Sequence, residues 1–266
     1  MKRPRFSLAA GLSIFCAAIA AVPSLFAQAD APAPSPAPAP SPAPAPGAAA
    51  AAASTNAPDA VSPELQKKMQ DVMDAFSKGN YDDALAKLAD AQKMRPNEPE
   101  LFNLQGAIYV KEEKWQPALD AFGKALAINP KYFPARFDSA EVLYLEKKYP
   151  DARAAFEKLQ SEDPRNELIQ YKVYLTYLLE GNLTEAKTLL DKFDFTGNTP
   201  AYYYAQAAWF YNQKNVPEAE SYISSAIQIF PPQSNNLFAE SLMDAGWLKR
   251  KTAADEAAEA AGAPPK

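Results

Sequence analysis

Aromatic side chains are the residues of this sequence best suited to contact another molecule. Six of the ten residues from Tyr202 to Tyr211 are aromatic. Such rings bury much apolar area at little cost in rotamer entropy, and tyrosine adds a hydroxyl for hydrogen bonding. At helical spacing most of them suit a hydrophobic core. A rival interpretation is that Tyr204 and Tyr211, with Glu141 or Asn212, stack on a sugar ring and hydrogen-bond it.

Histidine is absent from the sequence, and the single cysteine, Cys16, lies in an apolar N-terminal run. Zinc, copper and haem sites, cysteine nucleophiles, Ser-His-Asp triads and disulfides all need one of these residue types. We therefore predict no catalytic residue, no metal and no cofactor. No pair of carboxylates is placed at one site by its spacing, so glycoside hydrolysis is disfavoured. The chain is predicted not to be an enzyme.

The N-terminal segment 1–29 has the pattern of a secretory signal peptide. Three basic residues within the first five positions precede an uncharged run over 6–22, and a small-x-small site follows at 27–29. This order predicts export, with cleavage after Ala29 and a periplasmic or secreted product. The alternative is an uncleaved membrane anchor, because the run approaches the lower length limit of a bilayer span.

Two low-complexity segments flank the part of the chain expected to fold. Residues 30–62 are rich in Ala and Pro, with eight alternating prolines between Pro32 and Pro46, and predict a disordered, extended linker. Residues 251–266 form an Ala-rich tail, either a frayed helix or disordered.

The chain is acidic, with 27 basic and 32 acidic residues. Removal of residues 1–29 would leave 24 basic against 32 acidic residues, a net charge of −8. Without a basic cluster there is no counterion release to favour binding to nucleic acid or to an anionic membrane. Neither partner is expected, and membrane attachment is expected only if the signal segment is retained.

An internal period of about 34 residues, a length typical of stacked helical units, dominates the remaining sequence. The alanines at this period are Ala84, Ala118, Ala152, Ala186 and Ala219, and only the last step is shorter, by one position. The prolines Pro96, Pro130 and Pro164 keep the same step. Several markers at one such period indicate units that stack on one another.

The unit from residue 99 to 132 is the clearest. Apolar and small residues at helical spacing predict two helices separated by a short polar turn. Small residues at Gly106 and Ala118 would let the two helices approach closely, with aromatic rings above and below them. The unit is therefore predicted to be an antiparallel helical hairpin.

This unit resembles the tetratricopeptide repeat (TPR). The matching residues are Phe102, Gly106, Tyr109, Ala118, Phe122, Ala125 and Pro130. Four more units match in part, near 65–98, 133–166, 167–199 and 200–232. The unit 167–199 is the weakest because Tyr174 stands where a small residue is expected. The resemblance implies an all-α fold, a right-handed superhelical solenoid of antiparallel helix hairpins, with a TPR domain over 63–250. A capping helix near 236–250 is expected to cover the last hairpin.

The resemblance also implies where a partner binds, because first helices line the concave side of such solenoids. The residues carried over by position are Asn103, Lys111, Phe137, Glu141, Tyr144, Tyr171, Leu175, Leu178, Tyr204, Tyr211 and Asn212. They lie about 100° around the helix from the packing stripe, so they are surplus to hairpin formation. They predict an aromatic partner-binding groove. The alternative is that tight curvature or the C-terminal helix buries the same rings as core.

Taken together, these patterns predict an exported TPR scaffold that mediates protein–protein interaction in the cell envelope. Its groove would capture an extended peptide or an apolar helix of a protein partner. Two other functions remain open. One is a glycan-binding envelope protein, and the other is a self-assembling structural protein whose groove accepts the terminal helix or linker of another copy.

Overall fold

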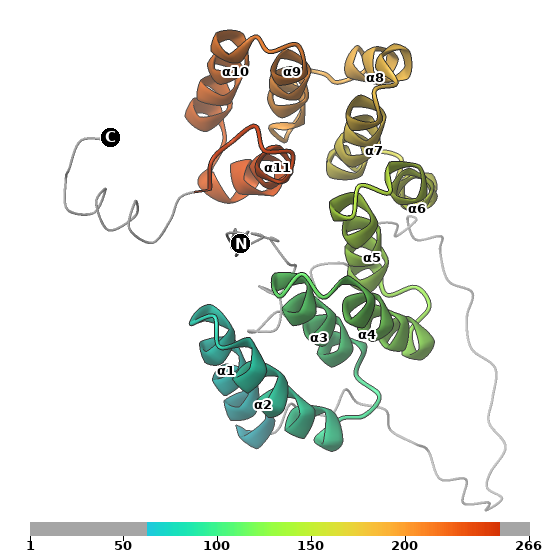
Figure 1. The fold of residues 1–266 in the computed structure, drawn as a ribbon, viewed down its shortest axis with the longest axis vertical. Coiled ribbons are helices and arrows are strands. Elements are labelled where there is room, and N and C mark those ends of the chain that lie inside the picture. The colour runs from blue at the N-terminus through green and yellow to red at the C-terminus, as the bar shows by residue number, and fades with distance from the viewer. Residues whose placement is uncertain (1–62, 251–266) are drawn as a thin grey trace, which may run out of the picture.

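The computed structural model describes residues 63–250, and all regular secondary structure within this range is α-helical (Figure 1). The helices are α1 (Pro63–Ser77), α2 (Tyr81–Met94), α3 (Pro99–Lys111), α4 (Trp115–Ile128), α5 (Phe133–Leu145), α6 (Tyr149–Glu162), α7 (Glu167–Glu180), α8 (Leu183–Leu190), α9 (Ala201–Asn212), α10 (Val216–Ile229) and α11 (Pro232–Asp244). Among these described helices, none has the length and apolar character needed to cross a membrane. The predicted signal peptide 1–29, linker 30–62 and tail 251–266 lie outside the described residues.

Helices α1 to α10 pair consecutively into five hairpins, and the turn inside each hairpin has the same backbone form. One residue in each turn has a positive φ: Gly79 (73°), Glu113 (57°), Lys147 (61°), Gly181 (88°) and Lys214 (62°). The next amide then donates back to a carbonyl in the last turn of the first helix, as from Lys114 to Tyr109 O at 2.9 Å. This Schellman-type ending satisfies carbonyls that the helix end would otherwise leave free. The backbone conformation of these turns therefore repeats with the same period as the sequence.

The five hairpins follow one another around an arc, and α11 lies on its inner side (Figure 1). Close approach of the two helices within a hairpin is clearest at Gly106 in α3. A Cβ at this position would overlap the ring of Phe122 in α4, which is fully buried. The predicted role of a small residue here is therefore confirmed.

The fourth hairpin departs most from the others. Its second helix, α8, has only eight residues, and an irregular segment leads from it to α9. Tyr174 of α7, at the position where a small residue was expected, is fully buried and its hydroxyl donates to Ala205 O at 2.9 Å. The large ring thus joins this hairpin to the next one.

Helix α11 begins and ends earlier than the helix predicted near 236–250. Pro232 occupies its first turn, a position that proline favours, and Gly246, with φ of 77°, follows its end. The amide of Gly246 donates to Met243 O at 3.0 Å, and that of Trp247 donates to Leu242 O at 2.8 Å. Helix α11 thus ends as the first helix of every hairpin does, close to one repeat period after the corresponding turn at Lys214. It has the form of the first helix of a sixth repeat.

Candidate partner-binding groove

The inward-facing side chains come from the first helices of hairpins two to five. In α5 and α7 the predicted groove residues are separated by four and then three positions, and in α9 Tyr204 and Tyr211 are separated by seven. These spacings place them on one face of each helix. Nine of the predicted groove residues are buried: Asn103, Phe137, Glu141, Tyr144, Tyr171, Leu175, Leu178, Tyr204 and Tyr211. Only Lys111 and Asn212 are partly exposed. The expectation of accessible rings is therefore wrong, and the predicted role of these residues in binding a partner stays a prediction.

The contacts that bury these residues differ along the face. Phe137 lies within its own hairpin, where its ring centroid is 5.6 Å from that of Phe156 in α6. Leu175 and Leu178 belong to the hydrophobic core that extends from α5 to α11. The tyrosines belong to the same core and are covered by α11 and the residues that follow it, as the alternative interpretation of the sequence proposed.

Phe238 is the central anchor of α11 on the concave face. Its ring centroid lies 5.2 Å from that of Tyr171 and 6.0 Å from that of Tyr204, and only 2% of its surface is exposed. Beyond the end of α11, Trp247 stacks on Tyr211 at 6.1 Å. Aromatic pairs at these separations add to the free energy of area burial. These rings of the predicted groove therefore already have partners within the chain.

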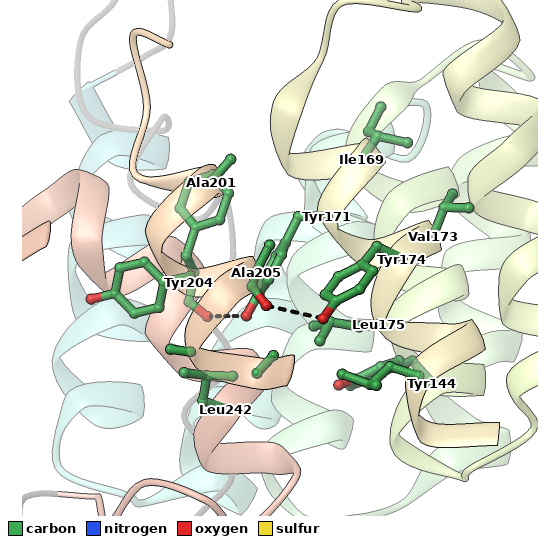
Figure 2. Close-up of a cluster of buried hydrophobic side chains, with 14 of the residues drawn as sticks. Tyr144, Ile169, Tyr171, Val173, Tyr174, Leu175, Ala201, Tyr204, Ala205 and Leu242 are labelled. Atoms are coloured by element: carbon green, nitrogen blue, oxygen red, sulfur yellow. Dashed lines mark hydrogen bonds between the residues drawn. The ribbon is translucent and has the colours of Figure 1, made fainter. Parts of the chain in front are cut away.

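Tyrosine hydroxyls of the groove also contact the backbone of α11. Tyr171 donates to Phe238 O at 3.4 Å, and Tyr144 donates to Ser241 O at 3.5 Å. Figure 2 shows Tyr171, Tyr204 and Leu242 of α11 together in this cluster. Burial raises the pKa of both Tyr144 and Tyr171 well above the usual value, so both hydroxyls remain donors at neutral pH. These contacts engage main-chain atoms and so do not depend on the side chains of the bound helix.

A set of buried polar pairs lies beside the tyrosines. Asn103 Nδ2 of α3 donates to Asp138 Oδ2 of α5 at 2.9 Å. Lys172 of α7 forms an ion pair with Glu141 of α5 at 2.5 Å, and its ammonium lies 5.1 Å from the ring centroid of Tyr144. The four polar residues of these two pairs are all at most 5% exposed. The pairs therefore join α3 to α5 and α5 to α7 across the inner side of the arc.

Burial controls the protonation of the carboxyl groups in this region. It raises the pKa of Asp138 to about 7, against the opposing effect of the Asn103 hydrogen bond. It also raises the pKa of Glu141, although Lys172 acts in the opposite direction. The pKa of Asp244, at the end of α11, is raised by burial and lowered by Lys172 among other cations. One lysine thus faces carboxylates from both α5 and α11.

Asp244, the last residue of α11, has a buried carboxylate. Its carboxylate pairs with Arg250, and 6% of its side chain is exposed. Lys111 of α3, a predicted groove residue, also attracts it electrostatically. The charged end of α11 is therefore directed toward cations of the concave face.

Asn212 and Tyr211 lie at the open end of the groove. They line a depression of about 730 Å³ together with Lys214, Val216, Glu220 and residues 246–249. Tyr211 and Trp247 stack on each other with an interplanar angle of 13°. The faces of these two rings that meet are not free to stack on a sugar.

Sequence reasoning missed Asp138, Lys172 and Asp244 as residues of this region. The signal available was polarity within apolar helices, since Asp138 and Lys172 occupy equivalent positions of consecutive repeats. Within the described range 63–250, no group of three or more acidic side chains is arranged to hold a metal ion.

Family models and curated relatives both match the repeat region of this chain. Two family models, each described as tetratricopeptide repeat, match residues 72–133 and 109–173. Tetratricopeptide repeat protein 28 of Mus musculus is 30% identical over 113 residues, which are 42% of this chain and 5% of the relative. The protein of the same name from Homo sapiens is 27% identical over the same shares. The match thus spans only 5% of the length of these curated relatives.

Solved structures show the same architecture at low sequence identity. TTC0263, a thermophilic TPR protein of Thermus thermophilus, has a TM-score of 0.51 at 20% identity, covering 67% of this chain and 99% of that one. A tetratricopeptide repeat protein of Parabacteroides merdae has a TM-score of 0.53 at 19% identity, covering 67% and 71%. PilW, a type IV pilus biogenesis factor, has a TM-score of 0.50 at 18% identity, covering 75% and 92%. These likenesses confirm the predicted fold, an all-α solenoid of helical hairpins.

Proposed function

Because this chain is a tetratricopeptide repeat protein, we propose that it is an exported scaffold that binds a protein partner in the cell envelope. The mechanism is non-covalent. Aromatic anchors on α7 and α9 bury apolar groups of the bound partner, and tyrosine hydroxyls hydrogen-bond to its backbone. The acidic surface suppresses non-specific contacts.

The observation that carries this proposal is the docking of α11 on the concave face. A helix bound there places one aromatic ring between Tyr171 and Tyr204 and offers carbonyl oxygens to two tyrosines. Binding of an amphipathic helix in a groove through a few buried anchors is a recurring mode of peptide recognition. The face therefore has the chemistry needed to hold a helix.

Export is proposed from the sequence alone. The basic start, the uncharged run and the small-x-small site at 27–29 have the order of a signal peptide, and the Ala/Pro-rich residues 30–62 separate it from the repeats. Sequencing of the N-terminus of the protein recovered from cells tests this proposal. A chain that begins at Asp30 supports cleavage after Ala29, and a chain that retains Met1 contradicts it.

Glycan binding is less well supported than protein binding. The sequence offered Tyr204 and Tyr211 as stacking surfaces for a sugar. In the structure Phe238 stacks on Tyr204 and Trp247 stacks on Tyr211. A sugar would therefore have to displace residues of the same chain from both rings.

Photo-crosslinking in the native envelope tests the scaffold function. A photoreactive residue at Asn212, on the rim of the concave face, should capture a defined protein that mass spectrometry identifies. The matched control is the same residue at Ile227 of α10, which is 61% exposed. Capture of the same protein from both positions would contradict binding through the concave face. Capture of only this chain would favour self-assembly, and capture of only glycan fragments would favour the sugar-binding alternative.

A further inference from the structure

Helix α11 lies on the surface assigned to a partner, and its form is that of a repeat helix without a second helix. It starts with proline in the first turn and ends in the same left-handed turn as α1, α3, α5, α7 and α9. No second helix follows it within the described residues, which end at 250. Its apolar face is covered by the concave side of hairpins three to five instead.

We infer that α11 is an intramolecular occupant of the concave face, and that the partner is an amphipathic helix that takes its place. This inference rests on the proposed function and specifies both the partner and its regulation. A closed chain excludes the partner, and an open chain, with α11 released, binds it. The apparent affinity for the partner is then reduced by the small fraction of chains that are open.

The contacts of α11 define the chemistry that the partner must carry. Phe238 fills the space between Tyr171 and Tyr204, and Leu242, one turn later on the same face, is fully buried. Ser241 lies three positions after Phe238 and is also fully buried, so only a small side chain fits there. The partner helix therefore needs an aromatic residue, a small residue three positions later and an aliphatic residue four positions later.

A carboxylate at the end of the helix completes this pattern. Asp244 follows Phe238 by six positions, and its buried side chain is attracted by Lys172 and Lys111 of the concave face. Lys172 is itself buried and already pairs with Glu141. A bound helix without an acidic group at this position would leave the region with fewer favourable charge contacts. The partner is thus expected to be acidic at the end of its docking helix.

Helix α11 is an imperfect occupant of the face. Among the described residues, Ser241 Oγ, Asn235 Oδ1 and Glu141 Oε1 are buried and lack a hydrogen-bond partner. A buried polar atom without a partner opposes docking, because the atom loses its contact with water. A partner helix with alanine in place of Ser241 would avoid one of these losses. Such a helix has an intrinsic advantage over α11.

The connection to α10 allows α11 to leave the face as a unit. Helix α10 ends at Ile229 and α11 begins at Pro232, and both intervening residues, Phe230 and Pro231, have extended backbone angles. Changes in a few dihedral angles at such a connector are enough to rotate a helix away from its neighbours. The rest of the solenoid does not need to unfold.

A labelled synthetic peptide of residues 231–250 tests the inference by fluorescence anisotropy with the full chain. Phe238→Ala in the chain weakens α11 and should raise the affinity for the peptide about ten-fold or more. The same change in the peptide should lower its affinity by about ten-fold or more. Ser241→Ala in the peptide should increase its affinity.

Two further variants of the chain guard against misfolding and non-specific effects. Trp247→Ala removes only the ring that stacks on Tyr211 beyond the end of α11, and should raise peptide affinity by a smaller factor. Ile227→Ala removes an exposed apolar side chain from α10 and should leave the affinity unchanged. Circular dichroism of each variant shows whether helical content is kept.

Equal peptide affinity for the parent, Phe238→Ala and Trp247→Ala chains would overturn the inference, as would no binding to any of them. If Asn212 still captures an envelope protein in that case, the proposed scaffold function stands and only the role of α11 fails. If the peptide behaves as expected and no envelope protein is captured, the scaffold proposal fails. If the parent chain forms dimers and the peptide dissociates them, the helix that binds the concave face comes from a second copy of the chain. That result would overturn the assignment of a foreign partner helix.

Discussion

Asp138 makes the stability of this solenoid depend on pH. Burial raises its pKa from 3.8 to about 7, and the side chain accepts a hydrogen bond from Asn103. Between pH 3.8 and about pH 7, the carboxyl group of Asp138 is ionised in the unfolded chain and protonated in the folded chain. The stability contributed by this group is therefore fully present below about pH 4 and is lost as the pH rises through about 7. A difference of this size between the folded and unfolded pKa corresponds to roughly 4 kcal/mol, which is an upper limit.

Replacement of Asp138 by Asn removes this titration and keeps the shape of the side chain. The amide oxygen still accepts the hydrogen bond from Asn103 Nδ2, and the new amide group supplies a donor near Asn103 Oδ1, which is buried without a partner. We expect parent and variant to differ by less than about 1 kcal/mol near pH 4. Near pH 8 the variant should be more stable, by up to about 4 kcal/mol.

Urea unfolding followed by circular dichroism measures this difference at steps between about pH 4 and about pH 8. The difference between parent and variant is the informative quantity, because other titrating groups contribute equally to both. Asp71→Asn, at an exposed position of α1, is the matched control for the removal of one carboxylate. A difference for Asp138→Asn that stays constant across the range would refute the reasoning, because it would mean that Asp138 is ionised in the folded chain.

Three further predictions concern stability and use the same urea assay. Gly106→Ala should destabilise the chain by about 1–3 kcal/mol because the added Cβ overlaps the Phe122 ring, whereas Gly123→Ala, with open space around it, should stabilise it by up to about 1 kcal/mol. Equal effects of the two changes would contradict the close approach of α3 and α4. Lys147→Gly should stabilise by up to about 1 kcal/mol, because φ there is 61°, and a loss of stability would argue against this turn geometry. Tyr174→Phe should cost about 1 kcal/mol through loss of the bond to a carbonyl of α9, and an unchanged midpoint would mean that this bond does not contribute.

The helical hairpins were predictable because their determinants are local and repeated. Small residues at Gly106 and Ala118 indicate that two helices approach closely, and the structure places the ring of Phe122 against Gly106. The left-handed turn residues were less visible. Glycine at positions 79 and 181 predicts such a turn. Glu113, Lys147 and Lys214 have the same left-handed conformation, which their residue types do not predict. Only their shared place in the period connects them.

Accessibility of the groove could not be predicted, because it depends on contacts between residues far apart in the sequence. Tyr144 and Ser241 are 97 residues apart, and Tyr171 and Phe238 are 67 apart. A repeat pattern describes how each hairpin meets its neighbours, and it carries no information on where a terminal helix crosses the array. The buried ion pair between Glu141 and Lys172 was missed for a similar reason, because its two residues are 31 positions apart in the sequence.

The docking of α11 combines favourable contacts with contributions that oppose it, and the opposing contributions favour its displacement. Burial of a phenylalanine ring such as that of Phe238 contributes about 1.5–3 kcal/mol. Each buried polar atom without a partner, such as Ser241 Oγ or Glu141 Oε1, costs about 1–3 kcal/mol. These losses reduce the net free energy that holds α11 below the sum of its favourable contacts. A competing helix that keeps the aromatic anchor and avoids one of these losses must still overcome the effective concentration of the tethered α11, which is on the order of millimolar for a short connection.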